Sequence, residues 1–595
     1  MKKRSEIKDE VKWDLSSLYK NDEEFEKDFN YLSQNYKKYK DFEGKLNNSS
    51  DIYKFFKFDE EFSKKYEAVY NYSSLRFDED VTNFKYQEIS GRVDKLSTDI
   101  SEVTSFIIPE MMKLNEEDVN RFMVENDKLK LYKYEFRNLL RAKPHVLSPK
   151  EEKILSLLSS PLSSFEEISS YLCNSDIKFG NILDSNLKEA ELTNTNFSVY
   201  ITDKNRDVRK NAFYSLYKQY ENMQNTFAKA YSSKVKYDNI SAKIRGYKSA
   251  RDAALFGGNI NSKIYDNLIN TLHKKLYIMD DYYKLKKEVM GLDELHIYDI
   301  YTDLIETSSK KYSFEEAKNI VIDALSILGE DYINNLKKAF DERWIDVYPN
   351  VGKKGGAYSS GCYISNPYVL LNFNGKFNDV STLAHELGHS MHSYYSIKNN
   401  PYIYYGYKIF VAEVASQVNE IILARYLIDH TDDDNEKLNI LDSLMELFKG
   451  SIVRQTMFAE FEDIVHKKES EGEVLTSKYL SDMYYDLYKK YSGSELTCDK
   501  EIRFEWEKIP HFYYNFYVYQ YATGLAAACF IASNILEGKK GYLEKYLEFL
   551  KLGGSMDPTD ELKVAGVDIN DPIVIEKCMD MFKNTIDEFK KIYEK

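Results

Sequence analysis

The chain has 595 residues, of which 43% are hydrophobic and 30% charged, and it carries a formal net charge of −15. This composition provides enough apolar material for a large core, which excludes a disordered protein and favours several helical layers or subdomains. Because an acidic chain repels phosphate backbones and its basic runs are short, we expect no nucleic-acid partner.

The cysteines and the hydropathy pattern give no sign of export. The five cysteines lie far apart and form no Cys-x-x-Cys pair, which argues against a disulfide framework and a cysteine zinc site. No apolar stretch has the length of a signal peptide or a membrane span, and the most apolar segment, 524–535, is predicted to be a buried helix. We expect a cytoplasmic protein without a membrane partner, either a monomer or a small homo-oligomer.

Helices are expected along most of the chain, which has only 10 prolines and 24 glycines. Between residues 20 and 140, apolar residues recur at spacings of three and four and predict several amphipathic helices. Ser148-Pro149 marks the start of a further helix. Residues 160–200 carry weaker helical signals and are interpreted as a turn or hairpin, and the helical pattern resumes near residue 203.

The best strand candidate lies between residues 350 and 378. Glycines cluster in the first half of this segment, and 368–373 has the pattern of a β-strand closed by an Asn374-Gly375 turn. Strand edges beside active sites can pair with an extended peptide, so we expect a peptide to lie near 370–373. The glycines are interpreted either as a loop that moves on binding or as ordinary turn residues.

A metal-binding pattern follows this strand. His385, Glu386 and His389 form the sequence His-Glu-x-x-His, and on a helix positions i and i+4 point the same way, so both imidazoles can reach one ion. Glu386 lies beside the first histidine, where it can take a proton from a water at the open position of a zinc site. Asp379 signals a helix start just before the pattern. The alternative is a chance match in which both histidines are only packed or surface residues.

His392 is excluded as a further ligand by its spacing. It follows His385 by two helical turns, which separates the two residues by about 10.5 Å along the axis. One ion with bonds of about 2.1 Å cannot be reached from both ends of that span. His392 is therefore interpreted as a packed or hydrogen-bonded residue, or alternatively as a group behind a ligand.

A third ligand must come from another segment, and Glu413 is the candidate. It is a lone carboxylate in an apolar run, an expensive place for a charge unless it is paired or binds a metal. Glu420 follows two turns later on roughly the same face. It is interpreted as a solvated or ion-paired residue, or as a group that orients a ligand histidine.

With these segments in hand, the chain resembles the oligoendopeptidase F branch of the M3 peptidases, the thimet-oligopeptidase-like family. The resemblance covers almost the whole chain, and the segments together, in this order, are specific to the branch. They are Trp13-Asp14-Leu15-Ser16-Ser17-Leu18-Tyr19, Asp207-Val208-Arg209-Lys210, Arg245-Gly246-Tyr247, His385 to His392, Ala412 to Ser416, and Ile509 to Gly524.

The resemblance implies a fold and a domain plan. The fold is mostly α, a multi-helix two-lobed body with a deep central channel and a small β-sheet beside the zinc site. The plan has an N-terminal helical region over 1–110, an oligopeptidase F-type subdomain over 111–200, and a catalytic domain over 201–595. A channel of this kind admits flexible oligopeptides and mostly excludes folded proteins.

The resemblance also implies the chemistry. It places one Zn²⁺ per chain on His385, His389 and Glu413, and it gives Glu386 the role of general base.

A histidine and tyrosines of the late segment steady the oxyanion in this family. His511 matches the histidine. At helical spacing Tyr514, Tyr517 and Tyr521 share one face, and a stripe of this kind is either core or substrate-contacting, so both roles stay open for each tyrosine.

The sequence therefore predicts a zinc metalloendopeptidase that hydrolyses internal bonds of oligopeptides. Two rivals remain. One is a peptide-binding or chaperone-like protein that keeps the scaffold and releases peptides intact. The other is a zinc hydrolase that acts on non-peptide amides.

Overall fold

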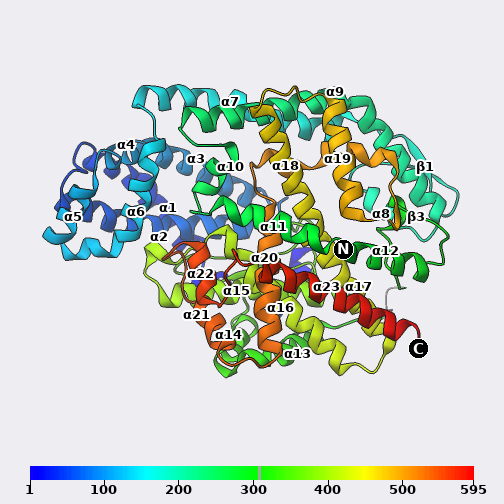
Figure 1. Cartoon of the computed structure of the whole chain (residues 1–595). Coiled ribbons are helices and arrows are strands. Elements are labelled where there is room, and N and C mark those ends of the chain that lie inside the picture. The colour runs from blue at the N-terminus through cyan, green and yellow to red at the C-terminus, as the bar shows by residue number, and fades with distance from the viewer. Residues whose placement is uncertain (306–309) are drawn as a thin grey trace. The chain divides into compact units, whose positions relative to one another are not determined.

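The computed structural model describes residues 1–305 and 310–595, apart from the side chain of residue 160. The chain is mostly helical, as the sequence predicts, and divides into two compact units. Unit 1 comprises residues 1–146, 310–423 and 531–566, and unit 2 comprises the described residues of 147–309, 424–530 and 567–595. Figure 1 follows the chain through both units. The central channel implied by the family resemblance stays a prediction.

Unit 1 begins with amphipathic helices whose ends are set by capping residues. Asn48 and Asn115 each accept a backbone amide hydrogen from the third residue of the helix that follows. The helices of this unit are α1 (Asp22–Asn35), α2 (Ser49–Glu79), α3 (Phe84–Thr104), α4 (Ile107–Met111), α5 (Glu116–Glu125), α6 (Lys133–Ala142), α13 (Phe314–Ala324), α14 (Glu330–Asp341), α15 (Phe377–Asn399), α21 (Tyr542–Phe549) and α22 (Pro558–Val564). The helices α16 (Ile409–His430) and α20 (Tyr519–Leu536) each contribute residues to both units.

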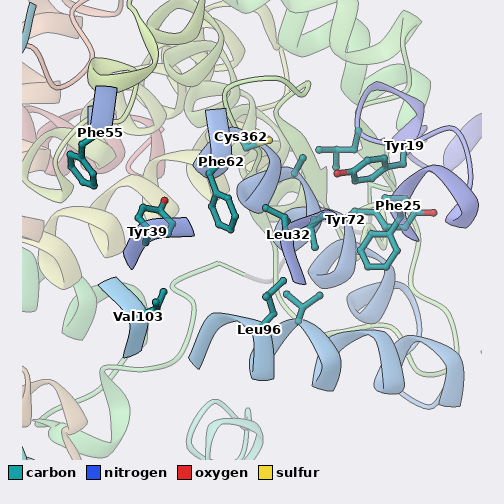
Figure 2. Packing of buried hydrophobic residues seen from close by; sticks show 14 of the residues in the cluster. Tyr19, Phe25, Leu32, Tyr39, Phe55, Phe62, Tyr72, Leu96, Val103 and Cys362 are labelled. Atoms are coloured by element: carbon teal, nitrogen blue, oxygen red, sulfur yellow. The ribbon is translucent and has the colours of Figure 1, made fainter. Parts of the chain in front are cut away.

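Aromatic rings fill the core around the first three helices. The rings of Phe25 and Tyr72 stack with centroids 5.3 Å apart, and Tyr19 meets Tyr72 edge to face at 5.4 Å. Tyr39 and Phe62 are buried in the same cluster, which also includes a cysteine from much later in the chain (Figure 2). Segments that are hundreds of residues apart in the sequence therefore share one core.

The N-terminal segment 13–19 attaches this core to a small sheet. The indole of Trp13 is buried, donates to the carboxylate of Glu79 at 2.6 Å, and meets the ring of Tyr368 edge to face at 6.2 Å. The hydroxyl of Tyr368 donates to the backbone carbonyl of Asp14 at 2.8 Å. The family-specific sequence at the start of the chain thus holds a strand that lies more than 300 residues later.

That strand is the centre of a three-stranded sheet. The order is β4 (Ile345–Asp346), β6 (Tyr368–Leu370) and β5 (Tyr358–Ser360), with β6 parallel to β4 and antiparallel to β5. The predicted strand therefore exists at 368–370, where both of its edges are occupied by other strands, so a peptide cannot pair with β6 itself. That a peptide lies near 370–373 stays a prediction. The edge strands of the sheet are β4 and β5, and the N-terminal segment forms backbone hydrogen bonds at both ends of β4, from Asp14 to Arg343 and from Val347 to Val11.

Unit 2 is built on one long helix. Its helices are α7 (Pro149–Tyr171), α8 (Phe197–Ile201), α9 (Arg206–Ile244), α10 (Ala250–Phe256), α11 (Ser262–Lys275), α12 (Tyr277–Val289), α17 (Asp434–Phe448), α18 (Arg454–Ser470), α19 (Ser477–Ser492) and α23 (Pro572–Tyr593). The helices α9, α18 and α19 pack against one another (Figure 1). Strands β3 (Leu295–His296) and β7 (Leu496–Thr497) form a short parallel pair.

The two middle segments of the family resemblance have structural roles in unit 2. Arg209 is almost fully buried and pairs with the buried carboxylate of Asp299 at 2.7 Å. Arg245 forms a two-pronged contact with Glu152, at 2.8 and 2.9 Å. Both pairs tie a helix terminus to a distant part of the same unit.

Most of the local predictions hold. Ser148 caps α7, and a hairpin of β1 (Asn181–Leu183) and β2 (Glu189–Glu191) follows. The helix α7 continues to Tyr171, so the weak signals from residue 160 onward underestimate it, since a serine-rich stretch lacks the apolar period. The apolar segment 524–535 is the buried helix α20, and all five cysteines are free thiols. None of the helices in the described ranges combines the length and apolar character that a bilayer-spanning segment needs.

One buried acid makes unit 1 sensitive to pH. Glu561 on α22 is 1% exposed, and its Oε1 has no hydrogen-bond partner among the described residues. Burial is the main cause that raises the pKa of this carboxyl to about 8. An unfolded glutamate ionises near pH 4.3, so between that pH and about 8 the folded state binds the extra proton. Stability therefore falls as the pH rises through this window.

Replacing Glu561 with Gln should remove this pH dependence. In the wild type, Glu561 lowers the free energy of unfolding by about 1.4 kcal/mol for each pH unit within the window, and the substitution removes this contribution. We expect the thermal midpoint of E561Q to fall less than that of the wild type between pH 6 and pH 8.5, by roughly 2–5 °C. The exposed Glu117, changed to Gln, is the matched control and should track the wild type. Equal pH dependence in E561Q and the wild type would show that Glu561 is not held neutral.

Candidate metal centre

The histidines predicted to bind metal stand on α15. This helix begins two residues before Asp379, because the carboxylate of Asp379 accepts the backbone amides of Asn374 and Lys376, at 3.0 and 2.8 Å. Asp379 therefore stabilises the helix from inside its first turn rather than as its capping residue. His385 and His389 follow on successive turns and point the same way, as the spacing of four predicts.

A backbone contact brings α16 against α15. Gly388 lies between the two histidines, and a Cβ atom built on it would lie 2.5 Å from the Cα of Ser416 and 2.7 Å from the carbonyl oxygen of Ala415. The buried amide of Asn419 on α16 donates to the carbonyl of Ala384, at 3.1 Å. Only glycine allows the two helices to approach this closely at that position.

The close approach gathers three donor atoms. His385 Nε2 lies 3.2 Å from His389 Nε2, and Glu413 Oε2 lies 3.4 Å from the first of these nitrogens and 3.5 Å from the second. Ligands at about 2.1 Å around a tetrahedral zinc ion lie about 3.4 Å from one another. Among the described residues, this is the group of histidine and carboxylate side chains that could hold a metal ion, and its spacing fits zinc with one position open.

A second glutamate of α16 contacts the first histidine. Glu420 Oε2 lies 3.1 Å from His385 Nδ1, and its other oxygen accepts from the hydroxyl of Ser381 at 3.3 Å. A carboxylate at Nδ1 assigns the proton to that nitrogen and leaves the Nε2 lone pair for a metal. The contact fits both interpretations of Glu420 from the sequence, an ion-paired residue and a group that orients a ligand histidine.

Burial and charge act in opposite directions on these groups. Burial would lower the pKa of His385, but the hydrogen bond and charge of Glu420 outweigh it and raise that pKa to about 9. Burial would raise the pKa of Glu413, but the hydrogen bond from His389 and the charge of both histidines hold it at about 2. Burial raises the pKa of Glu386, which is 6% exposed. Three carboxylates around two imidazoles favour a divalent cation.

His392 packs in the core and is not part of the metal group. Its ring is 1% exposed and stacks on Tyr407 with centroids 3.8 Å apart and an interplanar angle of 5°. Burial lowers the pKa of His392 to about 3, so the ring is neutral. The prediction that this histidine is packed is confirmed.

The residues predicted to contact the oxyanion gather within unit 2. The ring of His511 lies 5.6 Å from Tyr514, 6.3 Å from Tyr517 and 6.0 Å from Tyr521, measured between centroids. Tyr514 is 45% exposed, and the other three side chains are partly exposed. Four polar rings therefore meet in one cluster with access to solvent.

The expectation of one helical face for these tyrosines is wrong. The helix α20 begins at Tyr519, so only Tyr521 stands on it. Tyr514 and Tyr517 lie in a turn between a short 3-10 helix, Pro510–Tyr513, and α20. The chain reverses locally at residues 515 and 516, both of which have a positive φ. The three rings still come together, but through a turn rather than a helical repeat.

Sequence reasoning missed the contacts that assemble the metal group. Gly388 is the one of these residues that the sequence could have indicated. A glycine inside a helix destabilises that helix and often marks a place where another segment packs closely against it. The hydroxyl of Ser416, which donates to Glu413 Oε2 at 3.1 Å, and the amide of Asn419 had no such local signal. Their partners are fixed only when the two helices cross.

Comparison with known proteins identifies the family of the chain. Residues 199–581 match the sequence model of "Peptidase family M3", and residues 110–179 match that of "Oligopeptidase F". The chain therefore belongs to the M3 metallopeptidases, in their oligopeptidase F branch.

The similarity extends over the whole chain. Oligopeptidase PepF of Bacillus subtilis (strain 168) is 43% identical over 593 residues, which cover 100% of this chain and 88% of that protein. The crystal structure of a Chlamydophila abortus protein described as a peptidase is 35% identical, with a TM-score of 0.94, and covers 99% of this chain and 100% of that one. Oligoendopeptidase-F from Enterococcus faecium is 32% identical, with a TM-score of 0.75, and covers 96% and 99%.

Replacing Gly388 with Ala should weaken metal binding. The added Cβ meets backbone atoms of α16, so the two helices must separate and Glu413 must move away from the histidines. We expect at least a tenfold loss of zinc affinity, measured by competition with a chelating dye, and a lower thermal midpoint.

The matched control is Gly91 on α3, where a Cβ would meet nothing within 4 Å. G91A should keep its zinc and be neutral or slightly more stable, because alanine favours a helix. A G388A protein with wild-type zinc affinity would show that the helix contact does not set the ligand geometry.

Proposed function

We propose that this chain is a zinc-dependent endopeptidase that hydrolyses internal bonds of oligopeptides. The observation that carries the proposal is the triangle of His385, His389 and Glu413 donor atoms, at zinc spacing, with Glu386 next to it in the sequence. The relatives of the chain named oligopeptidase or oligoendopeptidase F support the substrate class. Because the described part of the chain holds one such group, we propose one zinc ion per chain.

Each residue of the metal centre has a distinct task. When bound, zinc supplies a Lewis acid that polarises the scissile carbonyl and lowers the pKa of water. Glu386 takes the proton of the attacking water and later returns it to the leaving amine, a role that suits a carboxyl whose pKa is raised by burial. Glu420 keeps the His385 ring in position throughout.

The remaining groups would bind the substrate and the developing oxyanion. His511 and one of the hydroxyls of Tyr514, Tyr517 and Tyr521 donate hydrogen bonds to the negative oxygen of the tetrahedral intermediate. The edge strand β5 pairs with the extended peptide backbone, since β6 has no free edge.

The organisation around this activity follows the family. We propose that 201–595 form the catalytic domain and are preceded by a subdomain over 111–200 and a helical region over 1–110. A deep channel would restrict the substrates to flexible oligopeptides, and the enzyme would act in the cytoplasm on peptides rather than on nucleic acids or membranes.

The proposal is tested by incubating a mixed library of oligopeptides with the protein and reading the products by mass spectrometry. We expect internal cuts that disappear with a zinc chelator and return when zinc is added. The E386Q variant should keep its zinc and lose about 10²–10⁴-fold in kcat, because it lacks the base. E117Q, at an exposed site of unit 1, should behave as the wild type.

The outcomes separate the alternatives. Peptides that stay intact in the presence of zinc-loaded protein would favour a peptide-binding protein, and cleavage of only non-peptide amides would favour the other hydrolase. Normal turnover by E386Q would eliminate Glu386 as the general base.

Glu413 is tested by metal content rather than by activity. E413Q removes one of three protein ligands and should lower zinc affinity by more than about 100-fold, whereas E420Q leaves all three in place and should lower it by about 10–100-fold. Zinc is measured by elemental analysis after dialysis against metal buffers. Stoichiometric zinc in E413Q would mean that another residue is the third ligand.

A further inference from the structure

The turn that carries Tyr514 and Tyr517 has an unusual backbone. Asn515 has a φ of 53° and Phe516 a φ of 56°, which places two consecutive residues with side chains in the left-handed region. Asparagine tolerates this region, but a bulky aromatic residue rarely occupies it. Such a conformation persists only where the surroundings impose it, and it concentrates at functional sites.

A buried acid holds this turn. The amide of Phe516 donates to Glu462 Oε1 at 2.6 Å, and Glu462, on α18, is fully buried. The ring of Phe516 is also buried and packs on His466 at 4.7 Å and on Tyr265 at 5.9 Å, between ring centroids. The middle of the turn is therefore held by the contact between Glu462 and the Phe516 amide and by an aromatic pocket around the Phe516 ring. Its two ends form backbone hydrogen bonds, from the Tyr514 amide to the His511 carbonyl at 3.0 Å and from the Gln520 amide to the Tyr517 carbonyl at 3.3 Å.

The polar surroundings of Glu462 are incompletely paired. Glu462 Oε2, Asn515 Oδ1 and the hydroxyl of Tyr231 are buried without a hydrogen-bond partner among the described residues. Burial raises the pKa of Glu462 to about 7. The charge of Asp238 acts in the same direction, whereas the charges of His466 and Lys234 and the hydrogen bond from the Phe516 amide lower this pKa. Burying an acid with an unpaired oxygen costs free energy of folding, and an apolar side chain would fill the same space without that cost.

We infer that Glu462 is a positioning residue for peptide hydrolysis, whose carboxyl locks the strained turn and thereby aims the hydroxyls of Tyr514 and Tyr517. This inference rests on the proposed role of these tyrosines at the oxyanion. Tyr521 stands on α20, outside the turn, although its ring lies 5.4 Å from that of Tyr517. Because the backbone of α20 holds Tyr521, the inference predicts that the loss of Glu462 displaces Tyr514 and Tyr517 more than Tyr521. Tyr521 can therefore serve as the control for Tyr514 and Tyr517, which lie in the turn.

The acceptor at Glu462 is tested with two substitutions of nearly the same size. E462Q keeps an oxygen that accepts from the Phe516 amide, and E462M replaces it with an apolar chain. We expect E462M to lose about 30–100-fold in kcat on an internally quenched peptide that the wild type cleaves, with KM changed by less than about 3-fold. E462Q should stay within about 3-fold of the wild type. Zinc content and circular dichroism should be unchanged in both.

Double-mutant cycles then ask whether Glu462 acts through the turn. If it does, adding E462M to Y517F or Y514F should cost less than about 3-fold beyond the slower single variant, because the hydroxyl it aims is already gone. Adding E462M to Y521F should multiply the two losses. If E462M does not fold, E462D replaces it, since its shorter carboxylate no longer reaches the amide of Phe516.

The outcomes distinguish this inference from the proposed function. Wild-type kcat in both Y514F and Y517F would reject the oxyanion role of these tyrosines, whatever Glu462 does. Slow Y514F or Y517F together with a fully active E462M, or with E462D as active as E462Q, would overturn the positioning role. An equal loss of kcat in E462Q and E462M would also overturn it. So would losses of kcat that multiply when E462M is combined with Y514F and with Y517F.

Discussion

The contact between α15 and α16 at Gly388 is the constraint on which the metal centre depends. Two histidines on one helix present two ligands by local geometry alone, but the third ligand must arrive from another helix with an error well below 1 Å. A contact between backbones has no side-chain freedom to absorb error, so it fixes Glu413 against the histidines. Because the two helices lie so close, Asn419 and Glu420 of α16 also contact α15, at Ala384 and His385. The contact at one glycine thus positions both the three candidate ligands and the residues that hold them in place.

The small sheet and the start of the chain reinforce the same region. Trp13 packs on Tyr368 of β6, β6 pairs with β5, and Ser359 of β5 meets Ser390 of α15 through their hydroxyls, at 2.8 Å. The sequence similarity near residue 13 therefore has a packing explanation, although it lies far from the metal centre in the chain. Arg209, buried against Asp299, plays a comparable part in unit 2. Shared sequence in this family records packing as well as chemistry.

The sequence predicts what local periodicity encodes, namely the helical fold, the pairing of His385 with His389 and the burial of His392. The sequence does not predict the features that depend on contacts with residues far away in the chain. The tyrosines at spacings of three and four fit a helix, yet Tyr514 and Tyr517 lie in a turn imposed by a glutamate more than fifty residues earlier. The strand at 368–370 was recognisable, but its central place in the sheet depends on β4 and β5, whose own patterns are too short to read.

Three buried glutamates show why geometry, rather than a raised pKa, identifies a functional acid. Burial raises the pKa of Glu386, Glu462 and Glu561 alike. Glu561 does not belong to the candidate metal group of the described residues, and its burial is therefore interpreted as a matter of stability. Glu386 adjoins two imidazoles aimed at one point, and Glu462 holds a strained turn that carries two phenols. The same desolvation therefore points to a role in the proposed hydrolysis only where the fold places reactive or substrate-binding groups next to the buried acid.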